Sequence, residues 1–139
     1  MKTSSIKVES RTERLIAVRD FVSEAARTFG FGDEDISKIA LAVDEACTNI
    51  IKHAYRSDPT KTIQVNVSAE NGSFVVAIRD EGVRFNPVQM QPPDMKEYLT
   101  HFRRGGLGVY LMKSLMDRVE YSIVSGNANE VRLIKNLPR

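Results

Sequence analysis

The sequence predicts an α+β fold, a two-layer α/β sandwich whose mostly antiparallel sheet carries helices on one face. Two long segments with helical spacing follow one another, and two pairs of alternating segments, typical of hairpins, flank a further helical segment. The chain has 139 residues and is 42% hydrophobic, which fits one domain with a substantial core. We therefore assign residues 1–139 to a single domain.

The first half of the chain is expected to form a short edge strand and two helices. Apolar and polar residues alternate over residues 6–8, as in a strand at the edge of a sheet. Apolar residues recur at helical spacing over residues 12–29 and 33–55, and Thr12 and Asp33 stand where capping residues are favoured. The second helix has one apolar stripe: Ile36, Ile39, Ala40, Val43, Cys47, Ile50 and Ala54.

The second half is expected to supply four more strands and one more helix. The alternating segments are residues 63–67, 74–78, 119–124 and 131–134. Asn71 and Gly72 predict a tight hairpin turn between the first two. Residues 83–104 lack periodicity, and loops of this length are usually functional or disordered. Helical spacing then returns through Leu111 and Met116.

Composition narrows the class of protein. The net charge is only +2, from 20 basic and 18 acidic residues, which gives little support to a dedicated nucleic-acid binder. No apolar run is long enough to span a bilayer, and the start shows no signal-peptide pattern, so we expect no membrane contact. Cys47 is the only cysteine, as expected in a reducing cytoplasm, and we interpret it as a buried hydrophobe.

The first candidate site is a polar strip on the second helix. Glu45 and Asn49 are four residues apart and Lys52 follows three later, so their side chains share one side of the helix, away from the apolar stripe. A carboxylate can take a proton from a nucleophile, an amide oxygen can help to hold Mg²⁺, and a lysine can neutralise phosphate. Ordinary solvated helix surfaces also carry such residues, so the strip by itself is weak evidence.

The second candidate site follows a strand that is expected to be buried. Asp80 could accept a hydrogen bond from an exocyclic amine such as that of adenine, and Gly82 would let the backbone approach a planar base closely. An aspartate in a solvated turn is the simpler interpretation if the motif is taken alone.

The third candidate site is a glycine-rich turn that opens the helix after the long loop. It comprises Arg104, Gly105, Gly106, Leu107 and Gly108. Exposed backbone N–H groups at the start of a helix favour an anion, and the arginine adds positive charge. The turn is not a Walker A loop, because no Gly-Lys-Ser/Thr follows, and no strand directly precedes it as in a Rossmann turn.

Together and in this order, the three motifs resemble those of the GHKL ATPase superfamily, which includes gyrase, Hsp90, histidine kinases and MutL and has the Bergerat ATP-binding fold. Residues 49–53 look like its N box, residues 80–82 like the start of its G1 box, and residues 105–108 like its G2 box. Residues 44–49 and 106–112 are similar to the anti-sigma factor serine kinases of the RsbW and SpoIIAB type, a branch of this size.

This resemblance implies a serine/threonine protein kinase that uses ATP and Mg²⁺, phosphorylates a STAS-domain antagonist and sequesters a sigma factor. It also implies a homodimer and an ATP lid at about residues 85–104. Glu45 would be the general base, and Asn49 a ligand of Mg²⁺. Asp80 and Gly82 would hold the adenine end of the nucleotide. The phosphate end would be held by Lys52, His53, Arg104, Gly105, Gly106, Leu107 and Gly108.

One departure from the family pattern leaves alternatives open. The G1 box usually reads Asp-x-Gly-x-Gly, but Arg84 replaces the second glycine, so the loop must turn differently there. One alternative is a catalytically silent module that binds ATP and switches partners. Another is a detached histidine-kinase domain, whose phosphorylated product would be acid-labile. The sequence names neither the sigma factor nor the response that it controls.

Overall fold

Ten elements make up the described part of the chain. The computed structural model describes residues 3–82, 106–124 and 128–138, without the side chains of residues 106–110. The elements are β1 (Ser4–Glu9), a 3-10 turn η1 (Thr12–Arg14), α1 (Leu15–Phe29), α2 (Asp33–Asn49), a π-helical turn η2 (Ile50–Ala54), β2 (Thr62–Glu70), β3 (Ser73–Asp80), α4 (Gly106–Leu115), β4 (Arg118–Val124) and β5 (Ala128–Asn136).

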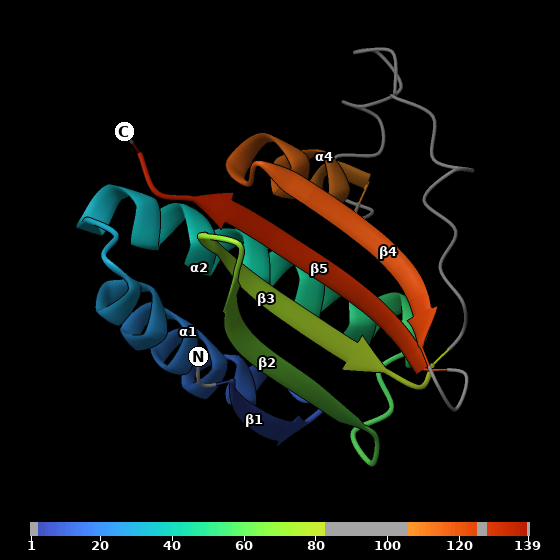
Figure 1. The fold of residues 1–139 in the computed structure, drawn as a ribbon. Helices are drawn as coiled ribbons and strands as arrows, with labels where there is room; N and C mark the ends of the chain where they lie inside the picture. The colour runs from blue at the N-terminus through green and yellow to red at the C-terminus, as the bar shows by residue number, and fades with distance from the viewer. Residues whose placement is uncertain (1–2, 83–105, 125–127, 139) are drawn as a thin grey trace.

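The strands form one five-stranded sheet in the order β1-β2-β3-β5-β4, and every neighbouring pair is antiparallel. Figure 1 shows α1, α2 and α4 on the same side of this sheet, and α2 packs against both other helices. The prediction of an α+β two-layer sandwich is confirmed. Because the last strand inserts beside β3, the end of β3 meets the beginning of β5 in the middle of the sheet.

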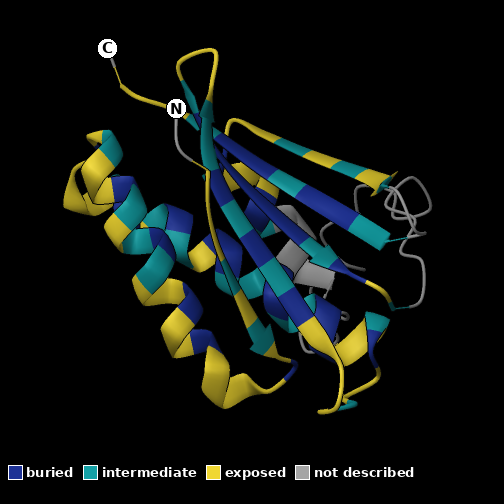
Figure 2. Cartoon of the chain, turned by 60° about the horizontal axis from the view of Figure 1, so that its bottom comes forward, coloured by how far each residue is buried: buried dark blue, intermediate teal, exposed yellow. Residues whose placement is uncertain are grey.

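The core lies between the sheet and the helices. Alternate residues of β3, namely Phe74, Val76 and Ile78, are buried in the same cluster as residues of α1 and α2. The buried residues of α1 recur every three or four positions, so its inner side faces the sheet while its outer side is exposed (Figure 2). Burying one such aliphatic or aromatic side chain stabilises the fold by roughly 1.5–3 kcal/mol.

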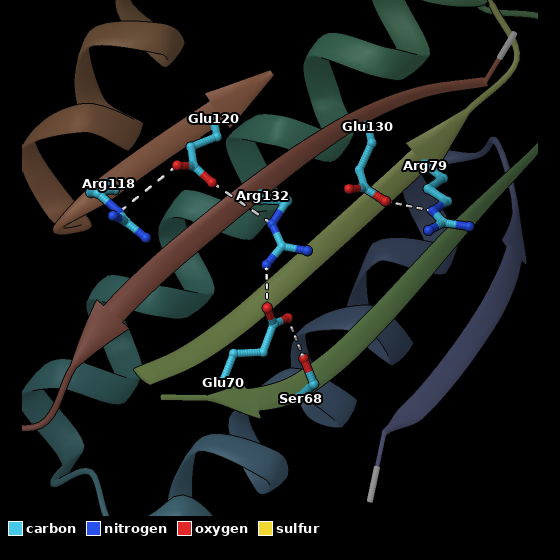
Figure 3. A network of polar contacts seen from close by, with 7 residues as sticks. All are labelled: Ser68, Glu70, Arg79, Arg118, Glu120, Glu130 and Arg132. Atoms are coloured by element: carbon cyan, nitrogen blue, oxygen red, sulfur yellow. Dashed lines mark hydrogen bonds and ion pairs between the residues drawn. The ribbon is translucent and has the colours of Figure 1, made fainter. Parts of the chain in front are cut away.

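The other face of the sheet is covered by its own charged side chains. Figure 3 shows a network of seven residues on β2 to β5: Ser68, Glu70, Arg79, Arg118, Glu120, Glu130 and Arg132. Its shortest contact joins Arg79 Nε and Glu130 Oε2 at 2.5 Å, where the two residues are cross-strand partners. The Glu130 side chain is only 4% exposed, so this pair is far less screened by solvent than the others.

Both predicted helix caps are wrong. Thr12 begins the η1 turn, and α1 starts at Leu15 with no side-chain cap. The N-cap of α2 is Gly32, while Asp33 is already the first helical residue. The first three residues of α2 are acidic, so they stabilise its N-terminus through the helix dipole instead of a capping hydrogen bond.

The apolar stripe of α2 is wider than predicted. Ala40 is only partly buried, whereas Ala42 and Ala46 are buried. The reason is that α1, α4 and the sheet all pack against α2, so a broader part of its circumference leaves solvent. Cys47 is buried as predicted, and burial raises the pKa of its thiol to about 12, which suits a hydrophobe rather than a nucleophile.

A candidate nucleotide-binding site

The predicted polar strip lies where α2 changes its geometry. Glu45 and Asn49 are both partly buried and stand one turn apart on α2, while Lys52 and His53 are exposed in η2. Here π-type hydrogen bonding takes over, since the N–H of Tyr55 donates to the carbonyl of Ile50 at 2.8 Å. Single π turns inside helices occur frequently at functional sites.

The electrostatic surroundings of Glu45 favour a proton acceptor. Burial raises the pKa of its carboxyl above the usual range, the neighbouring Asp44 raises it further, and the Lys52 ammonium lowers it. The influence of Lys52 is what the strip predicts, because that side chain must lie near the carboxylate to act on it. A carboxylate with a raised pKa is a stronger general base.

Asp80, the predicted adenine acceptor, ends β3 at the helix side of the sheet and is 7% exposed. Its Oδ1 accepts hydrogen bonds from the N–H of Gly82 at 2.8 Å and from Nδ2 of Asn129 at 3.0 Å. Burial raises the pKa of Asp80, and these two bonds oppose the rise. Both of these bonds within the described residues go to Oδ1, so Oδ2 is the carboxylate oxygen left to accept a hydrogen bond from a ligand.

Gly82 is needed for a contact that the sequence did not predict. A Cβ atom built on Gly82 would lie 2.4 Å from the carbonyl oxygen of Ala54 and 2.8 Å from its Cβ, closer than real atoms approach. The turn after β3 is therefore seated directly on the end of η2. The predicted approach of Gly82 to a planar base remains a prediction.

Two residues of this region were missed by sequence reasoning. The hydroxyl of Tyr55 donates to the carbonyl of Thr62 at 2.6 Å and accepts from the N–H of Glu81 at 2.8 Å. Asn129 donates to Asp80 and also to the carbonyl of Gly82 at 3.2 Å. Asn129 follows a Gly/Asn loop and looked like part of that turn, and only the pairing of β3 with β5 places it opposite Asp80.

The glycine-rich turn coincides with the start of α4. Gly106, Leu107 and Gly108 form the first helical turn, as the anion-site prediction requires, and the first N–H groups of a helix have no acceptor within it. Since α4 packs against α2, this turn opens a helix that neighbours the helix carrying Glu45 and Asn49. The predicted contacts of Arg104 and Gly105, the lid at 85–104 and the departure at Arg84 lie outside the described residues.

This combination of fold and motifs agrees with a family comparison. The family model of the histidine kinase-like ATPase domain matches residues 8–135. The chain belongs to this family. The match includes the polar strip of α2, Asp80 and the start of α4, so all three motifs lie inside the ATPase domain.

Relatives identify the branch of the family. The chain is 32% identical over 125 residues to the serine-protein kinase RsbW of Bacillus licheniformis, covering 87% of this chain and 78% of that protein. The values for RsbW of Bacillus subtilis are the same. The chain therefore belongs with the RsbW serine-protein kinases, and the predicted membership in a protein serine kinase branch of the ATPase superfamily is confirmed.

A solved structure supports the fold. The crystal structure of the RsbU and RsbW domains of Rv1364c from Mycobacterium tuberculosis superposes with a TM-score of 0.69 at 17% identity. It matches all of this chain, which spans 33% of that longer chain.

The described side chains of this ATPase domain form no protein cage around a metal ion. No group of three or more His, Cys, Asp or Glu side chains within the described residues could hold an ion. Mg²⁺ is commonly bound by one or two protein oxygens together with substrate phosphates and water. The Asn49 amide, one turn from Glu45, fits such a single ligand.

None of the described helices is long and apolar enough to cross a membrane.

Proposed function

We propose that this protein is an ATP-dependent kinase that phosphorylates a serine of a STAS-domain antagonist and that it also sequesters a sigma factor. Support comes from its place among the RsbW serine-protein kinases. The observation that carries the proposal is Glu45, a partly buried carboxylate with a raised pKa one turn from Asn49. A module that only binds nucleotide has no use for a proton acceptor at this position.

In this proposal the adenine base is recognised by Asp80. Its Oδ2 accepts a hydrogen bond from the exocyclic amine, while Gly82 and Asn129 hold Oδ1 in place. A fixed acceptor of this kind discriminates against a base that lacks the amine, because Oδ2 would then lose the hydrogen bond that the amine donates.

The phosphate chain is held at the other end of the site. The N–H groups of Gly106 to Gly108 face the phosphates, and Lys52, His53 and Arg104 neutralise their charge. Asn49 supplies an amide oxygen to Mg²⁺, and the metal, when bound, offsets charge on the phosphoryl oxygens. Phosphoryl transfer depends mainly on such positioning and charge stabilisation.

Glu45 performs the proton transfer. Its carboxylate accepts the proton of the substrate serine as the serine oxygen attacks the γ-phosphorus, and the bond to the β,γ-bridging oxygen breaks to release ADP. Removing a general base typically costs ~10²–10⁴-fold in rate.

The partners and the location complete the proposal. A homodimer would use β1 and α1, which is supported by the position of β1 at an edge of the described sheet. Sedimentation of the purified protein measures its oligomeric state directly, and a monomer at high concentration would exclude the homodimer.

We place the activity in the cytoplasm, a location that suits the single buried cysteine.

Incubation with MgATP and a STAS-domain protein, followed by intact mass, tests the kinase. We expect the mass of one phosphate on the STAS-domain protein and an acid-stable product, as for phosphoserine. An acid-labile product would identify a histidine kinase instead. Tight ATP binding without any mass change would identify a silent partner-switching module.

Asn49→Ala is expected to abolish Mg²⁺-dependent ATP binding, and an unchanged affinity would exclude Asn49 as a metal ligand.

A further inference from the structure

Three segments that are distant in sequence meet at the hydroxyl of Tyr55. The tyrosine directly follows η2, its hydroxyl donates to the carbonyl of Thr62 at the start of β2, and it accepts the N–H of Glu81 in the turn after β3. The donor-to-acceptor distances, 2.6 and 2.8 Å, are those of well-formed hydrogen bonds. The hydroxyl therefore ties the turn that follows Asp80 to the end of the helix that carries Asn49.

The tyrosine is held rigidly for this task. Tyr55 is only 6% exposed and belongs to the main hydrophobic core. Burial raises the pKa of Tyr55, the hydrogen bond from the Glu81 N–H lowers it, and the charges of Asp80 and Glu81 raise it. The hydroxyl thus keeps its proton, and with it the bond to Thr62, across the physiological range.

Gly82 independently indicates the same close seating. The absence of a side chain on Gly82 lets the turn rest on the carbonyl of Ala54, the residue before Tyr55. One hydrogen bond and one steric contact thus fix the turn on the same end of η2. Asp80 lies immediately before this turn, and Asn49 lies immediately before η2.

We propose that Tyr55 is a positioning residue for nucleotide recognition, whose hydroxyl holds Asp80 at a fixed place relative to Asn49. This inference rests on the proposed function, because it assigns Asp80 to the adenine and Asn49 to the phosphate end. The hydroxyl does not touch the nucleotide. It acts through the turn at residues 81–82, which directly follows Asp80, so that one rigid unit spans both ends of the site.

A purely structural tyrosine would behave differently from a positioning one. In Tyr55→Phe the ring stays in the core. Because Glu81 is exposed, water can replace the lost hydroxyl as the acceptor of the Glu81 N–H. The main consequence is then freedom of the turn. That freedom weakens the bond between Asp80 and the adenine amine more than it weakens contacts with the phosphates.

The test compares Tyr55→Phe with the wild type for two nucleotides, ATP and purine riboside triphosphate, which lacks the exocyclic amine. We expect ATP to bind the variant roughly tenfold more weakly, the cost of about one well-placed hydrogen bond. Binding of the amine-free nucleotide should change little, so the preference for ATP shrinks. Thermal unfolding of the variant is expected to stay cooperative.

Two further variants sharpen the comparison. Gly82→Ala should lower the preference for ATP in the same way, because the added methyl must push the turn away from Ala54. Ser73→Ala removes a side-chain hydrogen bond to Asn136 at the opposite end of β3 and should leave both affinities unchanged.

The outcomes separate this inference from the proposed function. A wild type that binds no ATP would overturn both. A wild type that prefers ATP, with Tyr55→Phe showing an equal preference or an equal loss for both nucleotides, would overturn only the positioning role. A reduced preference in both Tyr55→Phe and Gly82→Ala, and not in Ser73→Ala, is the expected result.

Discussion

Replacing Asp80 by asparagine tests the adenine site with almost no change in shape. The Oδ1 of asparagine can still accept from Gly82 and Asn129, so the turn should stay in place. The change falls on the second oxygen, which becomes an NH₂ group and turns a donor toward the adenine amine. The lost bond involves a charged acceptor and is worth about 1.5–3 kcal/mol, which corresponds to roughly 10- to 150-fold in affinity.

Isothermal titration with ATP measures this loss, and the amine-free purine nucleotide serves as the matched control. We expect Asp80→Asn to bind ATP far more weakly and to lose its preference between the two nucleotides. An ATP affinity equal to that of the wild type would refute the assignment of Asp80 to the base.

The same variant carries a prediction about stability. Burial raises the pKa of Asp80 in the folded state. A carboxyl with a raised folded-state pKa contributes stability at acidic pH, and this contribution is lost as the pH rises through that pKa. Asp80→Asn should therefore melt at a higher temperature than the wild type at neutral pH, with a difference that shrinks on acidification. A lower melting temperature at neutral pH would contradict this reasoning.

Three further predictions follow from single side chains. Because burial raises the pKa of Glu45, the phosphotransfer rate should fall on the acid side at a pH above the usual glutamate range, and a profile that is flat there would exclude it as the base. Cys47, whose thiol pKa is about 12, should resist a thiol reagent in the native protein and react after denaturation, so rapid native labelling would be the contrary result. Arg79→Ala should lower the free energy of unfolding by roughly 1–3 kcal/mol, because it leaves the buried Glu130 unpaired, although 42% exposure of the arginine moderates the loss. As a control, Arg118→Ala removes only an exposed ion pair on the same face of the sheet. It should change the free energy of unfolding, measured in urea, by less than about 0.5 kcal/mol.

Local patterns predicted the elements of the fold well. Alternation and helical spacing located the strands and helices because each follows from which side of an element meets the core. The predictions of the helix caps were wrong because a helix start is determined by a few backbone hydrogen bonds, and several arrangements satisfy them. The width of the buried side of α2 depends on how many neighbours pack on it, which spacing within one helix does not reveal.

The arrangement of the candidate site was predictable where one segment carries its residues. Glu45 and Asn49 share a helix, so their spacing placed them together. Tyr55 and Asn129 were missed because their partners come from other strands, and only the register of β3 with β5 brings Asn129 to Asp80. Tertiary contacts of this kind leave no signal in a single sequence.

The proposed role of Glu45 as the general base distinguishes a kinase from a module that only binds nucleotide. The most direct measurement is the single-turnover rate of phosphate transfer to a STAS-domain protein by the wild type and by Glu45→Ala, with ATP affinity determined in parallel. If Glu45 is the general base, Glu45→Ala should lose ~10²–10⁴-fold in rate and largely retain its affinity for ATP. Transfer by Glu45→Ala at the wild-type rate would contradict this role.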